Sequence, residues 1–212
     1  MNATLGHPHP PRARRILLVR HGETPSNAAR VVQTPDTPLS ARGVEQAERL
    51  AERLAALSVA RILASDLARA VQTAEPIEVQ TRAALELEPL LQERNFGDVR
   101  GTPYSELGFD LFAPDFEPPH GESWAAFHRR VDAAWQRVLD VAARTTGNLA
   151  VVTHGLVCYS LALRHLRLPA GAVPDMRVPN TALALIDPSP PFHVSLWGST
   201  AHLEVATEGG AA

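Results

Sequence analysis

Two short apolar segments, each of which ends in His-Gly, constrain the fold of this chain most strongly. Residues 16–19 (ILLV) lead into Arg20-His21-Gly22, and residues 149–153 (LAVVT) lead into His154-Gly155. Short, continuously apolar runs are typical of strands that are buried on both faces of a sheet. In open α/β sheets, ligands bind beyond the carboxyl ends of the strands, so we expect both imidazoles to face a single pocket.

The segments between these two runs alternate between helix and strand patterns. Ser40 is expected to cap a helix with apolar residues at helical spacing: Val44, Ala47, Leu50, Leu54 and Leu57. A strand over residues 61–64 precedes a helix over residues 67–75, with Asp66 as its N-cap and Pro76 ending it. This order predicts a single-domain, three-layer α/β fold: a doubly wound, mainly parallel sheet with helices on both faces.

The second half of the chain supplies the remaining helices and strands. A strand is expected over residues 85–91, and a long helix over residues 122–144 with one apolar stripe: Trp124, Phe127, Val131, Ala134, Val138 and Val141. Trp124 and Trp135 are expected in the core. A buried helix follows His154 through Leu166, and strands near residues 182–186 and 193–196 complete the sheet.

Three segments lie outside this regular pattern. Residues 102–121 are rich in proline and aromatic residues, which favours a lid-like excursion over a site or, equally, a simple surface connection. Residues 1–15 are expected to be a flexible N-terminal tail without a secretory signal, and residues 201–212 a C-terminal tail. The predicted domain therefore covers residues 16–200.

Composition restricts the partners and the chemistry. The formal net charge of −3, without any run of like charges, argues against nucleic acid as a partner, and no apolar segment is long enough to span a membrane. All 20 basic residues are arginine, which excludes Schiff-base chemistry and lysine-dependent phosphate loops. The lone Cys158 is interpreted as a small buried hydrophobe rather than a nucleophile. We expect a cytoplasmic protein whose partner is a small molecule.

Three strand ends bring cationic or potentially cationic side chains to the same edge of the predicted sheet. They are Arg20 with His21, Arg69 one turn beyond Ser65, and His154. Guanidinium groups match phosphate oxygens, and a neutral imidazole can attack phosphorus and later leave. This set suits a phosphoryl group, whose leaving oxygen needs a proton. Glu93, in a polar loop, is the best candidate for the acid, and Glu23 is its competitor.

These residues belong to a longer ordered set of motifs. In chain order the motifs are Arg20-His21-Gly22-Glu23-Thr24 with Asn27, Pro38-Leu39-Ser40 with Gly43, Ser65-Asp66-Leu67 with Arg69, Glu93-Arg94-Asn95-Phe96-Gly97, Gly121-Glu122-Ser123, and Thr153-His154-Gly155. The set closely resembles the histidine phosphatase superfamily, in its phosphoglycerate mutase-like form, over about residues 16–186. An isolated Arg-His-Gly is a weak signal, whereas the ordered set is specific.

The resemblance implies a role for each matched residue. His21 is the nucleophile that forms a phosphohistidine, and Arg20, Arg69 and His154 hold the phosphoryl oxygens. Glu93 is the general acid and later the base, and Asn27 adds a hydrogen bond to the phosphate. The family uses no metal, and no cofactor is expected. Gly22 and Gly155 are expected to let the backbone approach the substrate.

Departures from the family pattern favour a phosphatase that hydrolyses small phosphorylated metabolites. The excursion is short, and residues 31–36 lack the glycine with which the resembling mutases hold a substrate carboxylate. Glu93-Arg94 nevertheless resembles the mutase acid motif, so a cofactor-dependent phosphoglycerate mutase is the alternative. A catalytically silent phospho-ligand binding module and a phosphohistidine-protein phosphatase are further alternatives. His120 lies on the excursion and could touch the substrate; the oligomeric state is open.

Overall fold

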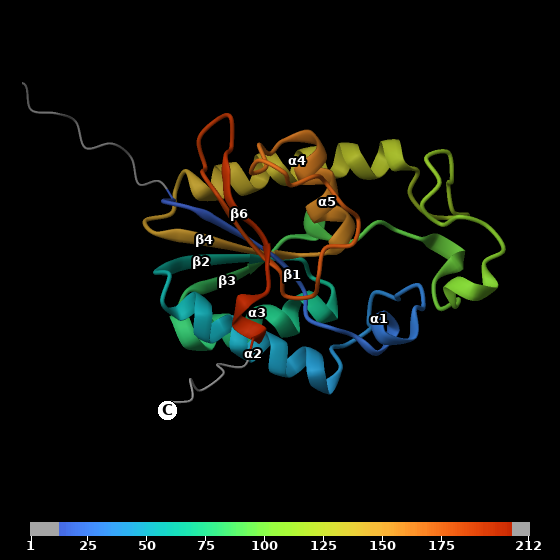
Figure 1. Cartoon of the computed structure of the whole chain (residues 1–212), viewed down its shortest axis with the longest axis horizontal. Helices are drawn as coiled ribbons and strands as arrows, with labels where there is room; N and C mark the ends of the chain where they lie inside the picture. The colour runs from blue at the N-terminus through green and yellow to red at the C-terminus, as the bar shows by residue number, and fades with distance from the viewer. Residues whose placement is uncertain (1–12, 205–212) are drawn as a thin grey trace, which may run out of the picture.

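A six-stranded sheet forms the centre of the computed structural model, which describes residues 13–204 (Figure 1). Its strands are β1 (Ile16–Arg20), β2 (Val59–Ala64), β3 (Ala84–Leu87), β4 (Asn148–Thr153), β5 (Leu183–Ile186) and β6 (Val194–Ser199). The order is β3-β2-β4-β1-β5-β6. The first four strands of that order pair in parallel, and β5 and β6 add an antiparallel edge. The predicted single-domain, mainly parallel α/β fold is confirmed.

Helices cover both faces of this sheet (Figure 1). On one face lie α2 (Ala41–Ala55) and α3 (Ala68–Thr81), and on the other lie α4 (Trp124–Ala142) and α5 (Gly155–Arg164); the short α1 (Pro25–Ala29) stands at the carboxyl edge. Side chains of β1 alternate between the layers, because successive residues of a strand point to opposite faces. Leu17 and Val19 pack with α2 and α3, and Ile16 and Leu18 pack with α4 and α5. This double burial explains why the strand is apolar at every position.

The first two major helices differ in detail from the prediction. Ser40 caps α2 as expected, accepting a hydrogen bond from the Gly43 N–H at 3.0 Å, but Val44 is 44% exposed and lies off the apolar face. Helix α3 does not end at Pro76; it continues to Thr81, and Leu67 rather than Asp66 is its N-cap. A proline inside a helix costs about 3 kcal/mol. Burial of Ala74 and Ile77 on either side of Pro76 against α2 offsets that cost.

The later elements follow the prediction more closely. Ser123 caps α4, and the predicted stripe is buried except at Trp124, which is partly exposed. Trp135 is buried in the core as expected. The strand expected over residues 85–91 is shorter: β3 ends at Leu87, and residues 89–91 form a 3-10 turn. Helix α5 ends at Arg164, slightly before Leu166.

The predicted tails are only partly described. Ala13 falls in the predicted N-terminal tail, yet it is 3% exposed and donates a 2.7 Å hydrogen bond to the Ala142 carbonyl. Residues 201–203 form a 3-10 turn against α2, where Arg49 donates to the Leu203 carbonyl. The remaining tail residues, 1–12 and 205–212, lie outside the described residues. Between residues 13 and 204, no helix combines the length and the apolar character needed to cross a membrane.

Two glycines set the distance between the loop after β1 and helix α2. A Cβ atom on Gly22 would lie 2.6 Å from the Gly43 carbonyl oxygen, and one on Gly43 would lie 2.0 Å from the Glu23 carbonyl oxygen. Gly22 is therefore needed for backbone packing against α2, a role that the sequence analysis did not identify; its expected role in the approach of a substrate stays a prediction. The segment that carries His21 rests directly on the α2 backbone.

This contact predicts that Gly43→Ala destabilises the protein. The added methyl group must push the Glu23 backbone away, and overpacking of this kind costs about 1–3 kcal/mol. Denaturant unfolding should therefore show a lower free energy of unfolding for this variant. Val44→Ala, at the neighbouring exposed position, serves as the control and should change stability by less than about 0.5 kcal/mol. Equal stabilities of the two variants would contradict the close packing.

Candidate functional site

Parallel pairing of β1 with β4 places the two histidines side by side. Arg20 is in register with Thr153, so His21 and His154 are the next residue on neighbouring strands. The His21 N–H donates to the Thr153 carbonyl at 2.8 Å, and the ring centroids of His21 and His154 are 5.1 Å apart. The structure thus brings together the two imidazoles that the His-Gly strand ends predicted.

The hydrogen bonds of each imidazole determine which ring nitrogen remains free. His21 Nδ1 lies 2.7 Å from the Gly22 carbonyl oxygen, which can only accept, so Nδ1 carries the hydrogen and Nε2 keeps its lone pair. His154 Nε2 lies 2.8 Å from the Ser65 hydroxyl at the end of β2. His154 Nδ1 is buried and has no hydrogen-bond partner among the described residues. Each ring therefore has one nitrogen that no hydrogen bond within residues 13–204 uses.

Arg20 and Arg69 bring two guanidinium groups to these histidines. Arg69, in the first turn of α3 and 2% exposed, donates from Nη1 to the Thr34 carbonyl at 3.1 Å, and Arg20 donates from Nη1 to the Val178 carbonyl. Within residues 13–204, the buried Nε of each arginine has no partner. Burial lowers the pKa of Arg69 to about 10 and also lowers that of Arg20. Unpaired buried donors on cationic groups favour an anionic ligand.

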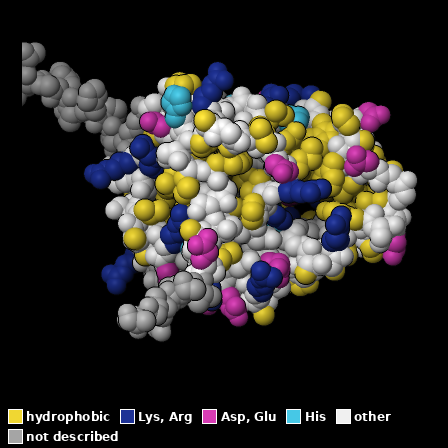
Figure 2. All heavy atoms as spheres, in the orientation of Figure 1, with side chains coloured by type: hydrophobic (Ala, Val, Ile, Leu, Met, Phe, Trp, Pro, Cys, Tyr) yellow, Lys and Arg dark blue, Asp and Glu magenta, His cyan; other side chains and the backbone are white. Residues whose placement is uncertain are grey.

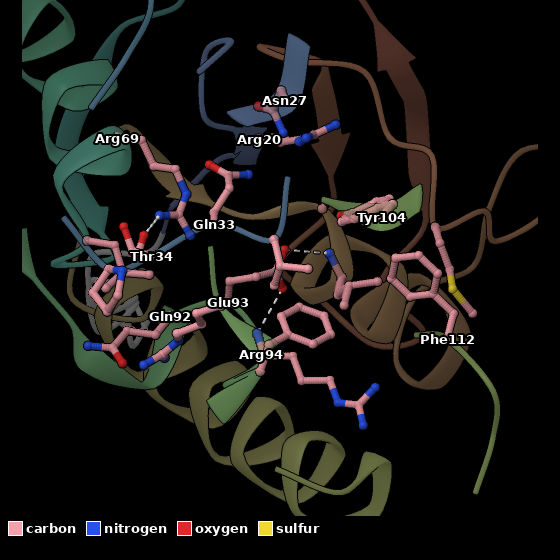
Figure 3. A pocket seen from close by; sticks show the side chains of 18 residues that line it. Arg20, Asn27, Gln33, Thr34, Arg69, Gln92, Glu93, Arg94, Tyr104 and Phe112 are labelled. Atoms are coloured by element: carbon pink, nitrogen blue, oxygen red, sulfur yellow. Dashed lines mark hydrogen bonds between the residues drawn. The ribbon is translucent and has the colours of Figure 1, made fainter. Parts of the chain in front are cut away.

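Glu93 is held by backbone N–H groups next to these cations (Figure 3). Its Oε1 accepts from the Arg94 N–H at 3.0 Å, and its Oε2 accepts from the Leu156 N–H, at the start of α5, at 3.2 Å. Burial raises the pKa of Glu93, although these N–H groups and the charges of Arg69 and Arg20 oppose the shift. An anion bound to the arginines would weaken that opposition, so Glu93 can hold a proton next to such a ligand.

The Glu93 loop is positioned by Arg130, a residue that the sequence analysis did not identify. Arg130, on α4, donates to the carbonyl oxygens of Leu90 and Gln92 at 2.8 Å and of Glu93 at 3.2 Å. It also pairs with Glu122 at 2.8 Å. Arg130 directly precedes Val131 of the apolar stripe, and periodicity shows only a charged residue there. The three carbonyl contacts are long-range and leave no local signal.

Asn27 lies on α1 at the edge of the same site. Its side-chain oxygen accepts from the Thr24 N–H at 3.3 Å in a capping box and from Asn180 Nδ2 at 3.2 Å. With the oxygen used in this way, the amide nitrogen is the group that Asn27 offers to the cavity. Figure 3 shows Asn27 beside Arg20.

A cavity of about 110 Å³ connects these side chains. Its lining includes four residues that the sequence analysis predicted for the site: Arg20, Asn27, Arg69 and Glu93. Both imidazoles are buried and are not among the residues that line it. Lining residues that the sequence analysis did not identify include Gln33, Gln92, Arg100 and Tyr104. Tyr104 and Phe112 come from the predicted excursion, which therefore does contribute to the cavity (Figure 3).

Three other candidates lie elsewhere. Glu23, the competitor of Glu93, bonds to the Ser40 hydroxyl at 3.0 Å and pairs with Arg42, and it does not line the cavity. His120 is exposed, pairs with Asp98 at 2.9 Å and is also absent from the cavity wall. Burial raises the pKa of Cys158 to about 12, in agreement with its interpretation as a buried hydrophobe.

The environment of the two histidines predicts a pH-dependent stability. Burial, followed by nearby arginines, lowers the pKa of both His21 and His154 well below its usual range, so both stay neutral in the folded state. The unfolded chain takes up protons below a pH of about 6.5, and the folded chain does not. The free energy of unfolding should therefore fall with decreasing pH, by about 1.4 kcal/mol per pH unit for each histidine.

Denaturant unfolding between pH 7.5 and 5.5 tests this expectation. His154→Gln removes one of the two groups, so the slope of stability against pH should become shallower than in the parent protein. His128 and His202, whose pKa values burial also lowers, are present in both proteins and do not affect the comparison. An unchanged slope would show that His154 is not held neutral by the fold.

Together, the fold and this geometry define an α/β protein with a cationic site at the carboxyl edge of its sheet, whose unpaired donors suit an anion. The sequence profile of the histidine phosphatase superfamily (branch 1) matches residues 16–196. The chain belongs to this superfamily.

The relatives of this chain are named for two different activities, phosphoglycerate mutase and phosphatase. A probable phosphoglycerate mutase GpmB of Yersinia pestis is 33% identical, over 90% of this chain and 95% of its own length. The solved structure of a putative alpha-ribazole-5'-P phosphatase from Escherichia coli is 29% identical with a TM-score of 0.75, covering 89% of this chain and 97% of its own. A mycobacterial glucosyl-3-phosphoglycerate phosphatase is 25% identical with a TM-score of 0.74, covering 89% and 100%.

Proposed function

We propose that this protein is a metal-independent phosphomonoesterase that hydrolyses small phosphorylated metabolites through a phosphohistidine on His21. The observation that carries the proposal is the neutral, buried His21 with a free Nε2, adjacent to two guanidinium groups whose Nε donors have no partner in the described part of the chain. A nucleophile without charge next to fixed cationic donors suits attack on a phosphate dianion.

In the first step, the His21 Nε2 lone pair forms a bond to phosphorus as the bond between phosphorus and the ester oxygen breaks. Arg20, Arg69, Asn27 and His154 hold the other phosphoryl oxygens, and Glu93 transfers its proton to the leaving oxygen. The Gly22 carbonyl, which accepts from His21 Nδ1, stabilises the positive charge that develops on the ring.

In the second step, water attacks the phosphohistidine. Glu93, now a carboxylate, takes a proton from that water as the bond between phosphorus and Nε2 breaks. His21 returns to its neutral form with Nδ1–H still directed at Gly22, and inorganic phosphate leaves.

A phosphoglycerate mutase is the alternative, supported by the names of the curated relatives and by the Glu93-Arg94 pair. Arg94, however, uses Nε and Nη2 for the carbonyl oxygens of Glu122 and Phe116, and its guanidinium lies 4.3 Å from the Trp124 ring centroid. Two of its five N–H groups therefore bind backbone carbonyls, and its buried Nη1 has no partner within residues 13–204. Arg94 also lines the cavity, so this side chain does not separate the two activities, and hydrolysis is favoured by the short excursion and by the missing glycine in residues 31–36.

Hydrolysis without a metal is the first test. Purified protein in EDTA should release phosphate from a generic aryl phosphate between acidic and neutral pH, and His21→Ala should remove this activity. Interconversion of 3- and 2-phosphoglycerate, assayed with and without the bisphosphate primer, distinguishes the mutase. Activity of the parent protein no greater than that of His21→Ala would refute the proposal.

The role of Glu93 is tested with substrates of different leaving groups. Glu93→Gln should slow hydrolysis of alkyl phosphates by roughly 10²- to 10⁴-fold, because their leaving oxygen needs a proton. An activated aryl phosphate should still form an acid-labile phosphoenzyme on this variant. With alkyl phosphates, the parent rate should fall as pH rises through the pKa of Glu93, which burial raises, and the variant should lack this decline. Alkyl phosphate hydrolysis at the parental rate would exclude Glu93 as the acid.

A further inference from the structure

A second cavity adjoins the phosphate-facing one and differs from it in chemistry. It has a volume of about 180 Å³ and is lined by Phe112, Pro114, Trp124, His128, Tyr159 and Met176. Phe112 and Met176 line both cavities, so the two spaces share part of their walls. Figure 3 shows Phe112 on the side of the first cavity away from Arg69, with Glu93 between them. The Phe112 edge of the second cavity therefore lies on the side of the first cavity opposite Arg69.

The wall of the second cavity carries no formal charge. Five of its six lining side chains have no group that ionises near neutral pH, and the sixth, His128, is held neutral. His128 is 2.7 Å from the Ser160 hydroxyl through Nδ1, and burial lowers its pKa. Trp124 donates its indole N–H to the Ala113 carbonyl at 3.0 Å, so its polar atom is already paired. The surface offered to a ligand is aromatic and apolar.

This wall is held in place by contacts between the excursion and the domain. Phe112 packs edge-on against Phe96 and Tyr104, with ring centroids 6.4 and 6.2 Å apart. Arg94 donates to the Phe116 carbonyl, and Trp124 bonds to Ala113, which ties the excursion to the start of α4. The cavity is therefore formed before a ligand arrives, which reduces the cost of ordering it on binding.

We propose that the second cavity binds the leaving-group part of the substrate, which is the phosphate monoester of an alcohol with an uncharged aromatic or apolar body. The proposal rests on the proposed phosphatase function. A cavity of about 150 Å³ is large enough to hold benzene, so this one accommodates a single ring. An ester whose phosphate contacts Arg20 and Arg69 would pass Glu93 at its bridging oxygen and place its body between Phe112 and Met176.

A polar leaving group would have a different route. Both cavities share lining residues with a third and wider one of about 840 Å³, the charged mouth, whose lining includes Arg30, Asp110, Asp175 and Arg177. Figure 2 shows hydrophobic side chains gathered in the right-hand part of the view, with charged side chains among and around them. Esters of sugars or glycerate would extend into this charged mouth and gain nothing from the apolar cavity. The apolar cavity therefore predicts a preference for esters with aromatic or apolar leaving groups, whereas the charged mouth predicts a preference for esters with polar ones.

A matched pair of substrates separates these routes. Propyl phosphate and 3-phenylpropyl phosphate have alcohols of similar acidity, so their chemistry is alike and only the phenyl ring differs. Burial of the ring should raise kcat/KM by roughly ten- to a hundredfold. 3-Phosphoglycerate should be hydrolysed less efficiently than the phenylpropyl ester. The matching phosphonates, which are not hydrolysed, provide the same comparison as Kd values by calorimetry.

Two phenylalanines of the excursion, each replaced by alanine in a separate variant, provide a test of the cavity wall and its matched control. Phe112→Ala removes part of the cavity wall and should reduce the preference for the phenyl ring severalfold. Phe109→Ala should leave it unchanged, because Phe109 stacks on Phe116 at 4.7 Å and lines none of the three cavities. Met176→Gln, which keeps the length of the side chain and adds a polar group, repeats the test without creating a large void.

The outcomes distinguish this inference from the proposed function. Equal kcat/KM values for the two esters, equal Kd values for the two phosphonates, or equal effects of Phe112→Ala and Phe109→Ala would each overturn the apolar subsite. Tighter binding of the phenylpropyl phosphonate without hydrolysis of either ester would retain the subsite and reject the phosphatase. A preference for 3-phosphoglycerate would assign the substrate to the charged mouth instead.

Discussion

The parallel pairing of β1 with β4 is the constraint on which the rest of the site depends. Its register aligns Arg20 with Thr153 and therefore brings two imidazoles, 133 positions apart in the sequence, to a centroid distance of 5.1 Å. Ser65 enters the same edge because β2 pairs with β4, and its hydroxyl orients His154. Because neighbouring strands are rigidly linked by backbone hydrogen bonds, the polar groups at their ends keep their separation without further support.

Burial on both faces of the sheet gives these groups their chemical character. The helices that cover the sheet exclude water from His21, His154 and Arg69, which keeps the imidazoles neutral while the guanidinium groups remain cationic. Neutral nitrogen next to fixed positive charge is an arrangement that favours an incoming dianion over solvent. The same exclusion of water raises the pKa of Glu93, so one environment sets the protonation of both His21 and Glu93.

The residues on loops show where sequence reasoning reaches its limit. Glu93 and Asn27 were found through their motifs, and the structure places both at the cavity. Arg130, which holds three carbonyl oxygens of the Glu93 loop, has no motif of its own and looks like an ordinary charged helix residue. Pro76 shows the opposite error: it signals the end of a helix, but the burial of Ala74 and Ile77 outweighs the lost hydrogen bond. Local signals are reliable until long-range packing contributes more free energy than they do.

The sequence by itself determined the fold class, the positions of the strand ends and the set of residues that meet there. Apolar runs need burial, and burial on two faces requires a covered parallel sheet, so these properties follow from the pattern alone. Only the tertiary structure decided which ring nitrogen of each histidine is free, that the Glu23 carboxylate is paired away from the site, and that an aromatic cavity adjoins the cavity that Glu93 lines. Those features depend on contacts between residues distant in the chain, whose geometry no local pattern records.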